Sequence, residues 1–452
     1  MDLIVIGAGI SGVAVAAAAA RAGWSVAVVE QHATVAQGAS FAHGGLVLPP
    51  PFEPWFGPGP RMPEAGGLPW RRKARQQQAD EAALASSGLL AALSQTSRAA
   101  LATATDAHAL EFEACDGGLY LFRTPAALER AGALAATLRE AGTLSASTSR
   151  TLDANACRDA EPSLAHTEEL AGAVALDDML SGNCALAAKQ LKASLTLHGV
   201  AFHMMRHAVA IHPEAGRVAV DMRTATDAAG AFAGVQAVGF ETPLATPLTS
   251  APRHGDGRRG RDGIERLYAR RVVIAAGTGT TALLGGLGVA LPTTRIATQS
   301  LTGAILREEN APRRILVDAE RGVGIVRFEQ RLRISTALSG QAGAAPSARQ
   351  ADSLTELLHD CAEHRVAGVA RLNAAPSLCE HLLGADGQAL IGPLPAARGH
   401  GPRSGDERVF VMLAGSHRGW GLAFGAADLL VRQMQGEAAD DVTRALQPAR
   451  LG

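Results

Sequence analysis

The stretch MDLIVIGAGISGVAVAAAAARAGWSVAVVE, residues 1–30, decides the fold. It begins with a short apolar run over residues 2–6, whose β-branched composition predicts a strand buried on both faces. A glycine-rich turn follows, then an alanine-rich helix expected over residues 13–22, and then a strand over residues 25–30 that ends on an acidic residue. This order predicts a complete βαβ nucleotide-binding unit and therefore an α/β fold.

Each residue type in the turn has a physical reason. Gly7 permits a tight turn, Gly9 lets the backbone approach a pyrophosphate, and Gly12 lets the helix pack closely on the strand. The phosphates would lie on free N–H groups at the positive end of the helix, so the whole turn is expected to bind the cofactor: Gly7, Ala8, Gly9, Ile10, Ser11 and Gly12. Glu30 is placed to accept hydrogen bonds from both ribose hydroxyls, which argues against a 2′-phosphate. The pattern therefore indicates FAD or NAD rather than NADP.

The overall composition limits the class of protein. At 452 residues the chain can bury a large core, and its length suggests about two or three domains. A net charge of −1 and a near-neutral pI give no electrostatic case for nucleic-acid binding. The five cysteines are odd in number and contain no C-x-x-C pair, which fits a reducing compartment. Without a signal peptide or an apolar run of spanning length, we expect a cytoplasmic protein and leave open peripheral attachment to the inner face of the cytoplasmic membrane.

The segments after the βαβ unit predict a second domain that interrupts the nucleotide fold. The glycine-rich segment 38–45 predicts either a turn that offers backbone N–H donors or an ordinary loop. Prolines exclude a helix or central strand over residues 49–67. A helix over 74–110 and a strand over 117–124 are expected in the second domain, and residues 172–202 predict the return to the first.

Three later segments add to this organisation. Residues 242–263 are rich in Pro, Gly and Arg, which predicts a disordered hairpin tip or, as the alternative, a polyanion-binding patch. Residues 270–280 predict a buried strand that runs into Gly277, where the backbone can pass close to a ligand. A strand over 408–415 leads through a glycine-rich turn into a helix, whose N-terminus would stabilise an anionic reduced flavin.

These stretches together resemble the FAD-dependent D-amino acid dehydrogenases, within the wider group that includes glycine oxidase and sarcosine oxidase. The resemblance covers nearly the whole chain. It rests on VIGAGISG with Glu30, GASFAHGG followed by Pro54-Trp55, GGLYLFRT, EPSLA, LDDMLSGNC, SLTG, IVRFEQRLR, DGQALIGP and the final turn of the Gly-x-x-x-Gly-Trp type. The common order of so many matches makes the resemblance specific.

The resemblance implies a glutathione-reductase-like, Rossmann-type FAD-binding domain and a substrate domain that combines a mixed sheet with helices. The FAD domain would be discontinuous, with residues 1–48, 182–285 and 384–452, and the substrate domain would hold 49–181 and 286–383. Further FAD contacts are expected at Glu30, Gly38, Ala39, Ser40, His43, Gly44, Gly45, Val209, Ala276, Gly277, Gly392, Gly415, Arg418, Gly419 and Trp420. The reaction would move a hydride from the α-carbon of an amino acid to the flavin and give an imine, then a 2-oxo acid and ammonia, with quinone or another electron acceptor.

One position departs from the family pattern. The dehydrogenases read Gly-Leu-Arg-Pro before the DG turn, and that arginine binds the substrate carboxylate, whereas this chain places His381 there. Arg418 is a substitute, because the glycine-oxidase pattern Gly-His-x-Arg has an arginine at this place, although it could instead face the surface or a phosphate. Arg327 is a second candidate, but on an alternating strand such a residue more often faces solvent.

The roles of three other side chains stay open. His381 and His417 could carry protons, since histidine titrates near neutrality, or they could be hydrogen-bonding wall residues. Cys379 lies where sarcosine oxidases link flavin covalently, while the dehydrogenases have glycine there and hold FAD without a covalent bond. Inert packing is the alternative role of this cysteine. His43 replaces the asparagine that is usual beside the flavin.

The leading function is an FAD-dependent oxidoreductase of a small α-amino acid, D-configured or glycine-like, in amino acid catabolism. The missing arginine leaves other amines open, such as a sarcosine-like substrate or a tRNA aminomethyl group. It also leaves open a flavoprotein subunit that passes electrons to a partner chain, or a degenerate relative without turnover. Reduction of the bound flavin by free amino acids would separate these alternatives.

Overall fold

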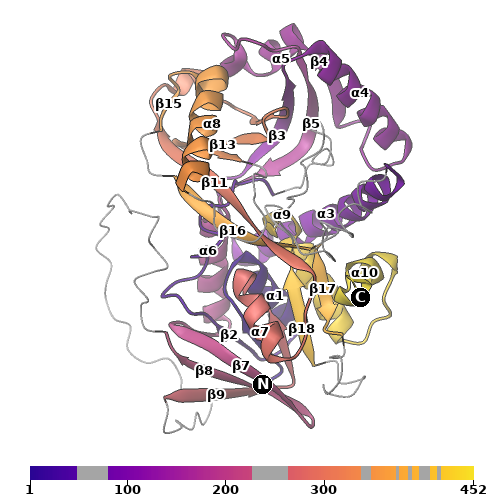
Figure 1. The fold of residues 1–452 in the computed structure, drawn as a ribbon, viewed down its shortest axis with the longest axis vertical. Coiled ribbons are helices and arrows are strands. Elements are labelled where there is room, and N and C mark those ends of the chain that lie inside the picture. The colour runs from indigo at the N-terminus through magenta and orange to yellow at the C-terminus, as the bar shows by residue number, and fades with distance from the viewer. Residues whose placement is uncertain are drawn as a thin grey trace.

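Three β-sheets organise the computed structural model of this protein. It describes residues 1–47, 80–225, 263–336, 348–372, 376–384, 389–395, 408–414 and 419–451. A lower part contains two of the sheets, and an upper part contains the third and largest sheet (Figure 1). The proline-rich segment 49–67 and the insertion 242–263, apart from Gly263, lie outside the described residues.

The first sheet is built on the predicted βαβ unit. Its strands follow the order β17 (Leu390–Pro393), β18 (Val409–Leu413), β10 (Arg271–Ile274), β1 (Leu3–Ile6), β2 (Val26–Val29) and β6 (Ala201–His203). All neighbours pair in parallel except β17 and β18, which are antiparallel. Every residue of β1 is buried, as its continuous apolar run predicts. The carboxyl ends of β1, β2 and β10 therefore meet at one edge, where the glycine turn begins.

Helices cover one face of this sheet, and a small antiparallel sheet covers the other. Leu3 and Val5 share a core with the helices α1 (Ile10–Arg21), α3 (Asp80–His108), α6 (Cys184–Leu197) and α9 (Gly419–Met434). Ile4 and Ile6 pack on the opposite side, against the strands β7 (Arg206–Glu214), β8 (Arg217–Thr224) and β9 (Ile264–Ala269) and the short helix α7 (Thr280–Gly286). The alternation of side chains along β1 therefore serves both layers.

Helix α1 begins at Ile10, earlier than the predicted start at residue 13. Its N-cap is Gly9, which has no side chain to accept a hydrogen bond, and the Ser40 hydroxyl accepts from the Ile10 N–H instead, at 3.0 Å. The following first-turn N–H groups have no partner within the helix. The local pattern could not show this start, because the capping hydroxyl comes from a distant loop.

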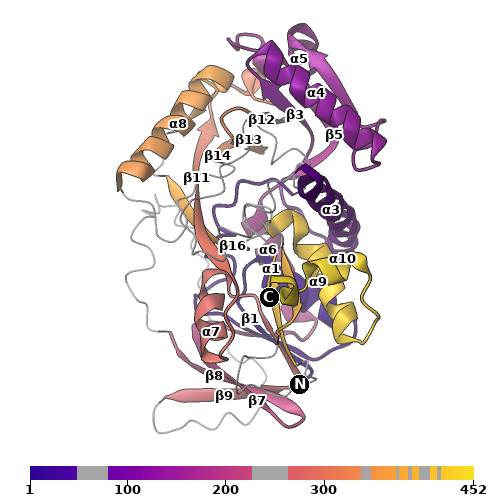
Figure 2. The ribbon, with the colours of Figure 1, turned by 45° about the vertical axis from the view of Figure 1, so that its right-hand side comes forward.

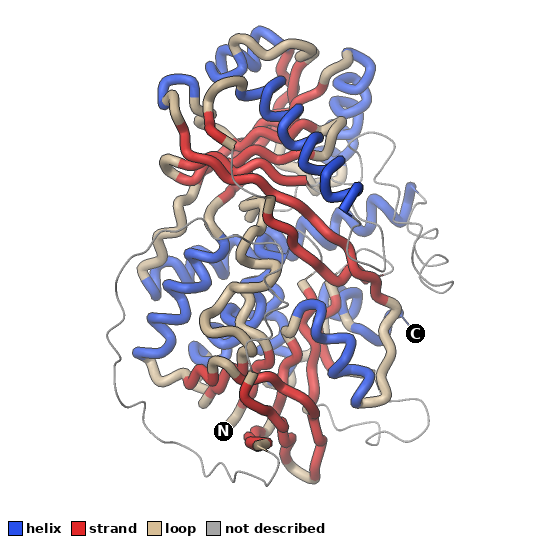
Figure 3. The backbone as a smooth tube through the Cα atoms, turned by 60° about the vertical axis from the view of Figure 1, so that its left-hand side comes forward, coloured by secondary structure: helices blue, strands red, loops and turns tan. Residues whose placement is uncertain are grey.

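The second sheet has nine strands and forms the upper part. They are β15 (Ala370–Arg371), β11 (Thr293–Ile305), β14 (Arg331–Thr336), β13 (Val323–Phe328), β12 (Ile315–Asp318), β3 (Cys115–Phe122), β5 (Gly172–Ser181) and β4 (Ser149–Asp153) in spatial order, with β16 (Ser377–Gly384) also paired to β11. α8 (Ala348–Val366) covers one face and α4 (Pro125–Glu140) the other (Figure 2). Figure 3 shows the long pair β11 and β16 running from this sheet down into the lower part.

Helix α3 departs from the expected domain division. The sequence analysis placed residues 80–108 in the substrate domain, but Leu93 and Leu101 of α3 lie in the core of the first sheet, beside α9 (Figure 2). Gly425 of α9 makes the close approach possible, since a Cβ there would lie 2.6 Å from the Ser97 nitrogen. The apolar stripe of α3 predicted a buried face but not which core would bury it.

Candidate functional site

The glycine turn after β1 has the close packing that its sequence predicts. Gly7 has φ +102°, and a Cβ there would lie 2.5 Å from the Ala275 carbonyl oxygen at the end of β10. A Cβ on Gly12 would fall closer to the Gly7 carbonyl oxygen than any non-bonded contact allows. The turn thus brings the first strand, the helix and the end of β10, with Ala276 and Gly277, to one place.

Glu30 lies at the end of β2, beside the glycine turn, and is 7% exposed. Its Oε2 accepts a hydrogen bond from the Ala8 N–H at 2.7 Å, and its Oε1 accepts from the His32 N–H at 2.9 Å. Each carboxylate oxygen retains acceptor capacity beyond these bonds. The two backbone bonds fix the carboxylate in the position from which it could accept from a ribose.

The predicted loop 38–45 lies on one face of the second sheet. A Cβ on Gly44 would lie 2.5 Å from the Ser335 hydroxyl, and a Cβ on Gly45, which has φ +93°, would lie 2.7 Å from the Phe328 ring. The Ser300 hydroxyl donates to the Ala42 carbonyl at 3.2 Å. Only glycines let the loop backbone approach β13 and β14 so closely.

Strand pairing decides which arginines face this loop. Within the hairpin β13–β14, Val326 is opposite Arg333 and Arg327 is opposite Leu332, so Arg327 and Arg333 lie on different faces of the sheet. Arg327 pairs with Glu308 and donates to the Glu329 carbonyl. The structure therefore does not bring Arg327 to the loop.

Arg333, which the sequence analysis did not single out, faces the loop instead. Its Nη1 donates to the His43 carbonyl at 2.8 Å, its Nε donates to the Thr302 hydroxyl at 2.9 Å, and its guanidinium lies 5.0 Å from the centroid of the Phe328 ring. Burial lowers the pKa of Arg333 to about 10. No carboxylate of the described chain lies within 4.0 Å of it. Recognising the tight turn between β13 and β14 in the sequence would have shown on which face of the sheet Arg333 lies.

Glu113, an acidic side chain whose charge acts on Arg333, is already paired with other residues. Glu113 accepts from Arg331 Nη2 at 2.6 Å and from Asn183 Nδ2 at 2.8 Å. Arg333 thus carries a partly buried positive charge that its described surroundings do not neutralise, and two of its donors are already fixed. A guanidinium held in this way is pre-organised to bind an anionic group through Nη2.

His381 and Cys379 are two residues apart on β16 and therefore lie on the same face of the second sheet. The residues opposite them on β11 are Ile296 and Thr298. His381 is 7% exposed, and its Nε2 lies 3.0 Å from the Thr298 hydroxyl. The Cys379 thiol donates to the Ala39 carbonyl at 3.3 Å, within the predicted flavin loop. The position in which the resemblance implies an arginine is therefore part of this site.

Trp420 closes the site from the side of the first sheet. It is fully buried at the start of α9, with its ring edge-on to His43 at 6.1 Å and to Phe112 at 5.7 Å. Its Nε1–H has no hydrogen-bond partner in the described chain. Gly419 is the first residue of α9, which begins slightly before the predicted helix. Gly415, His417 and Arg418, predicted in the turn before it, lie outside the described residues.

Gly392 and Val209 are two further residues that the sequence analysis predicts as FAD contacts. Gly392 lies in β17 with φ +138°, and a Cβ there would lie 3.0 Å from the Gln433 side chain. Val209 lies at the irregularity of β7 between Ala208 and Ala210. The contact of these two residues with the cofactor stays a prediction.

These residues fit FAD. The glycine turn leaves room for a diphosphate in front of α1, and Glu30 stands beside that turn for a ribose. The loop 38–45 and the polar face of the second sheet with Arg333 lie together where the flavin ring is expected. Within the described chain no group of three or more His, Cys, Asp or Glu side chains could hold a metal ion.

The fold and this site define a class, the FAD dependent oxidoreductases. The chain belongs to the DAO family of this description, whose sequence pattern matches residues 2–433. Its cofactor is FAD, and its fold is a Rossmann-type FAD-binding domain with a mixed-sheet substrate domain, as the sequence analysis expected.

Known proteins of this family resemble the chain over its whole length. A protein named D-amino acid dehydrogenase from Methylobacterium nodulans is 27% identical over 474 residues, which cover 100% of this chain and 99% of that protein. The structure of glycine oxidase from Geobacillus kaustophilus has a TM-score of 0.65 and 17% identity and covers 98% of this chain and 97% of its own. Iminodiacetate oxidase from Chelativorans sp. BNC1 has a TM-score of 0.67 and 16% identity, with 99% and 98% covered.

We expect FAD to be bound without a covalent link to Cys379. Burial raises the pKa of this thiol to about 11, so the thiolate that could attack a flavin is scarce at neutral pH. Acid precipitation should release all of the flavin into the supernatant, from the wild-type protein and from the Cys379→Ser variant alike. Yellow colour retained in the washed pellet of the wild type but not of the variant would contradict this expectation.

Among the helices that the structure describes, none is both long and apolar enough to cross a membrane.

Proposed function

We propose that the protein oxidises the bond between the α-carbon and the nitrogen of a small amino acid of the D-configuration. Two electrons and two protons leave the substrate, which becomes an imine, and water then converts the imine into a 2-oxo acid and ammonia. FAD supplies the hydride acceptor when it is bound. The names of the relatives, D-amino acid dehydrogenase and glycine oxidase, support this substrate class.

The observation that carries the proposal is the uncompensated charge of Arg333. Its guanidinium, held by two fixed donors, leaves Nη2 for a substrate carboxylate on the polar face that also holds His381. Arg418, outside the described residues, is proposed as a second carboxylate partner. His381 would contribute a hydrogen bond rather than take the proton, because its Nε2 already engages the Thr298 hydroxyl.

Anaerobic titration tests the proposal. The purified yellow protein is titrated with D-amino acids, glycine, sarcosine and L-proline, and bleaching of the visible flavin band is measured. We expect an amino acid to bleach the band, and we expect Arg333→Met to raise the substrate concentration needed by about 100-fold, the usual effect of truncating one member of a buried charge pair. Arg327→Met is the matched control, because its arginine faces away from the loop.

Binding of a plain carboxylate gives a second readout that does not depend on turnover. Acetate or benzoate should perturb the flavin spectrum, with a dissociation constant raised by Arg333→Met and unchanged by Arg327→Met. A bound flavin that none of the amino acids reduces would overturn the proposal and favour a partner-dependent or degenerate flavoprotein. The electron acceptor, quinone or another, and a position at the inner face of the cytoplasmic membrane belong to the same proposal.

A further inference from the structure

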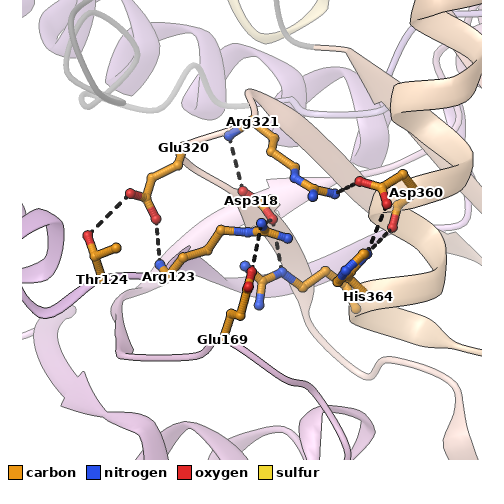
Figure 4. Close-up of polar contacts among 9 residues, drawn as sticks. Arg123, Thr124, Glu169, Asp318, Glu320, Arg321, Asp360 and His364 are labelled. Carbon is orange, nitrogen blue, oxygen red and sulfur yellow. Dashed lines mark hydrogen bonds and ion pairs between the residues drawn. The ribbon is translucent and has the colours of Figure 1, made fainter.

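A second cluster of arginines lies on the opposite face of the nine-stranded sheet from the flavin loop. Asp318 is the last residue of β12 and is opposite Val323, on the face covered by α8. Arg365 reaches it from the end of α8. Arg123 reaches it from just beyond β3 (Figure 4). The side chains of Asp318 and Arg365 are 0% exposed, so this is an interior charge cluster.

The hydrogen-bond donors of the cluster exceed its acceptors. Arg365 donates through Nε to Asp318 Oδ2 at 2.9 Å, but its buried Nη1 and Nη2 have no partner in the described chain. Arg123 pairs through Nη1 with Glu169 at 2.9 Å, and its buried Nε and Nη2 make no hydrogen bond there. Its Nε lies 3.6 Å from the same Asp318 oxygen. Two guanidinium groups therefore converge on one carboxylate oxygen.

The other carboxylates nearby do not supply the missing acceptors. Glu320 accepts from the Arg123 backbone N–H at 2.6 Å and faces the Thr124 hydroxyl. Asp360 pairs with Arg321 and His364, as Figure 4 shows. Glu169 is 60% exposed and so neutralises Arg123 only weakly. The buried donors of Arg365 and Arg123 that Asp318 does not reach therefore find no acceptor among these carboxylates.

The number of unsatisfied buried donors favours a bound anion over a bound water molecule. An unsatisfied buried donor costs about 1–3 kcal/mol, and a buried charge without a partner costs more. A water molecule accepts two hydrogen bonds, whereas a small anion accepts several and so can serve more of the unsatisfied donors. We propose that a small inorganic anion of the size of chloride binds between Arg365 and Arg123 and bridges the donors that Asp318 leaves unsatisfied.

This anion would fasten α8 to the sheet. Arg365 belongs to the last turn of α8, a helix that also contacts β11 through a hydrogen bond from Gln299 Nε2 to the Thr355 hydroxyl at 2.8 Å. Arg123 is 17% exposed, which gives solvent ions a path to the cluster. The anion would then stabilise the folded protein by mass action, because it binds only where the three segments meet.

Thermal unfolding of the FAD-loaded protein tests this proposal. Sodium chloride is exchanged for sodium gluconate at constant ionic strength, and Tm is followed by the release of flavin fluorescence. We expect a saturable rise of Tm with chloride in the wild type and a flat response in Arg365→Met or, should that variant not fold, in Arg123→Met. The Arg266→Met variant, whose arginine pairs with Asp221 in the small sheet, is the control and should keep the wild-type response.

Crystals soaked in bromide give a direct measurement on the wild-type protein. We expect an anomalous peak within hydrogen-bond distance of Arg365 Nη1 or Nη2. A water molecule in place of the peak, or equal Tm values in chloride and gluconate, would overturn the proposal. An anomalous peak without any chloride dependence of Tm would show an adventitious ion only and would overturn it as well.

Discussion

Replacing Gly12 with alanine is expected to abolish tight FAD binding. The new Cβ would overlap the Gly7 carbonyl oxygen and lie 3.0 Å from the Gly7 carbonyl carbon, and both are backbone atoms that cannot swing aside as a flexible side chain could. Either α1 moves away from β1 or the glycine turn opens, and in both cases the first-turn N–H groups leave the place of the diphosphate. We expect the dissociation constant for FAD to rise by at least about 100-fold, which corresponds to about 2.7 kcal/mol.

The measurement is the flavin-to-protein ratio after purification, followed by FAD titration of the apoprotein with quenching of flavin fluorescence. The matched control is Gly285→Ala in α7, because a Cβ there meets nothing within 4 Å and alanine favours a helix. Circular dichroism should show that both variants are folded. FAD affinity of Gly12→Ala within threefold of the wild type would show that the turn tolerates a side chain and would refute the explanation.

Replacing Asp318 with asparagine is expected to be the most destabilising conservative substitution in the upper part of the molecule. The amide keeps the shape but removes the negative charge that faces Arg365 at 2.9 Å and Arg123 at 3.6 Å. Breaking such a buried pair typically costs about 3–5 kcal/mol, because the remaining charge stays buried without compensation. This is a large part of the about 5–15 kcal/mol that separates folded from unfolded states in most proteins.

The urea midpoint, followed by circular dichroism, measures this loss. Asp177→Asn is the control, since this aspartate also pairs with two arginines, Arg150 and Arg314, but its side chain is 33% exposed and water screens the pair. We expect the control to lower stability by at most about 1 kcal/mol. Equal midpoints for the two variants would mean that burial does not distinguish these clusters.

The local sequence pattern shows which arginines are candidates for the site, and strand pairing decides which of them faces the loop. Arg327 and Arg333 both lie in IVRFEQRLR, and composition gives no reason to prefer either. The turn between β13 and β14 reverses the chain so that Val326 faces Arg333, and this pairing turns one arginine to the loop and the other to Glu308. A shift of one residue in this register would place both arginines on the same face, because residues directly opposite each other share a face of the sheet.

The sequence by itself determined the nucleotide-binding unit, since this depends on local rules: a buried apolar run, glycines at fixed spacing and an acidic strand end. The flavin family and the second domain were indicated by the resemblance that the ordered motifs carry. Tertiary structure alone decided that Ser40 caps α1, that α3 packs in the core of the first sheet and that Arg333 faces the flavin loop. It also decided that Asp318, Arg123 and Arg365 meet in the interior. Each of these contacts joins segments that are distant along the chain, and the free energy that selects among such pairings comes from packing and desolvation, which no short stretch of sequence encodes.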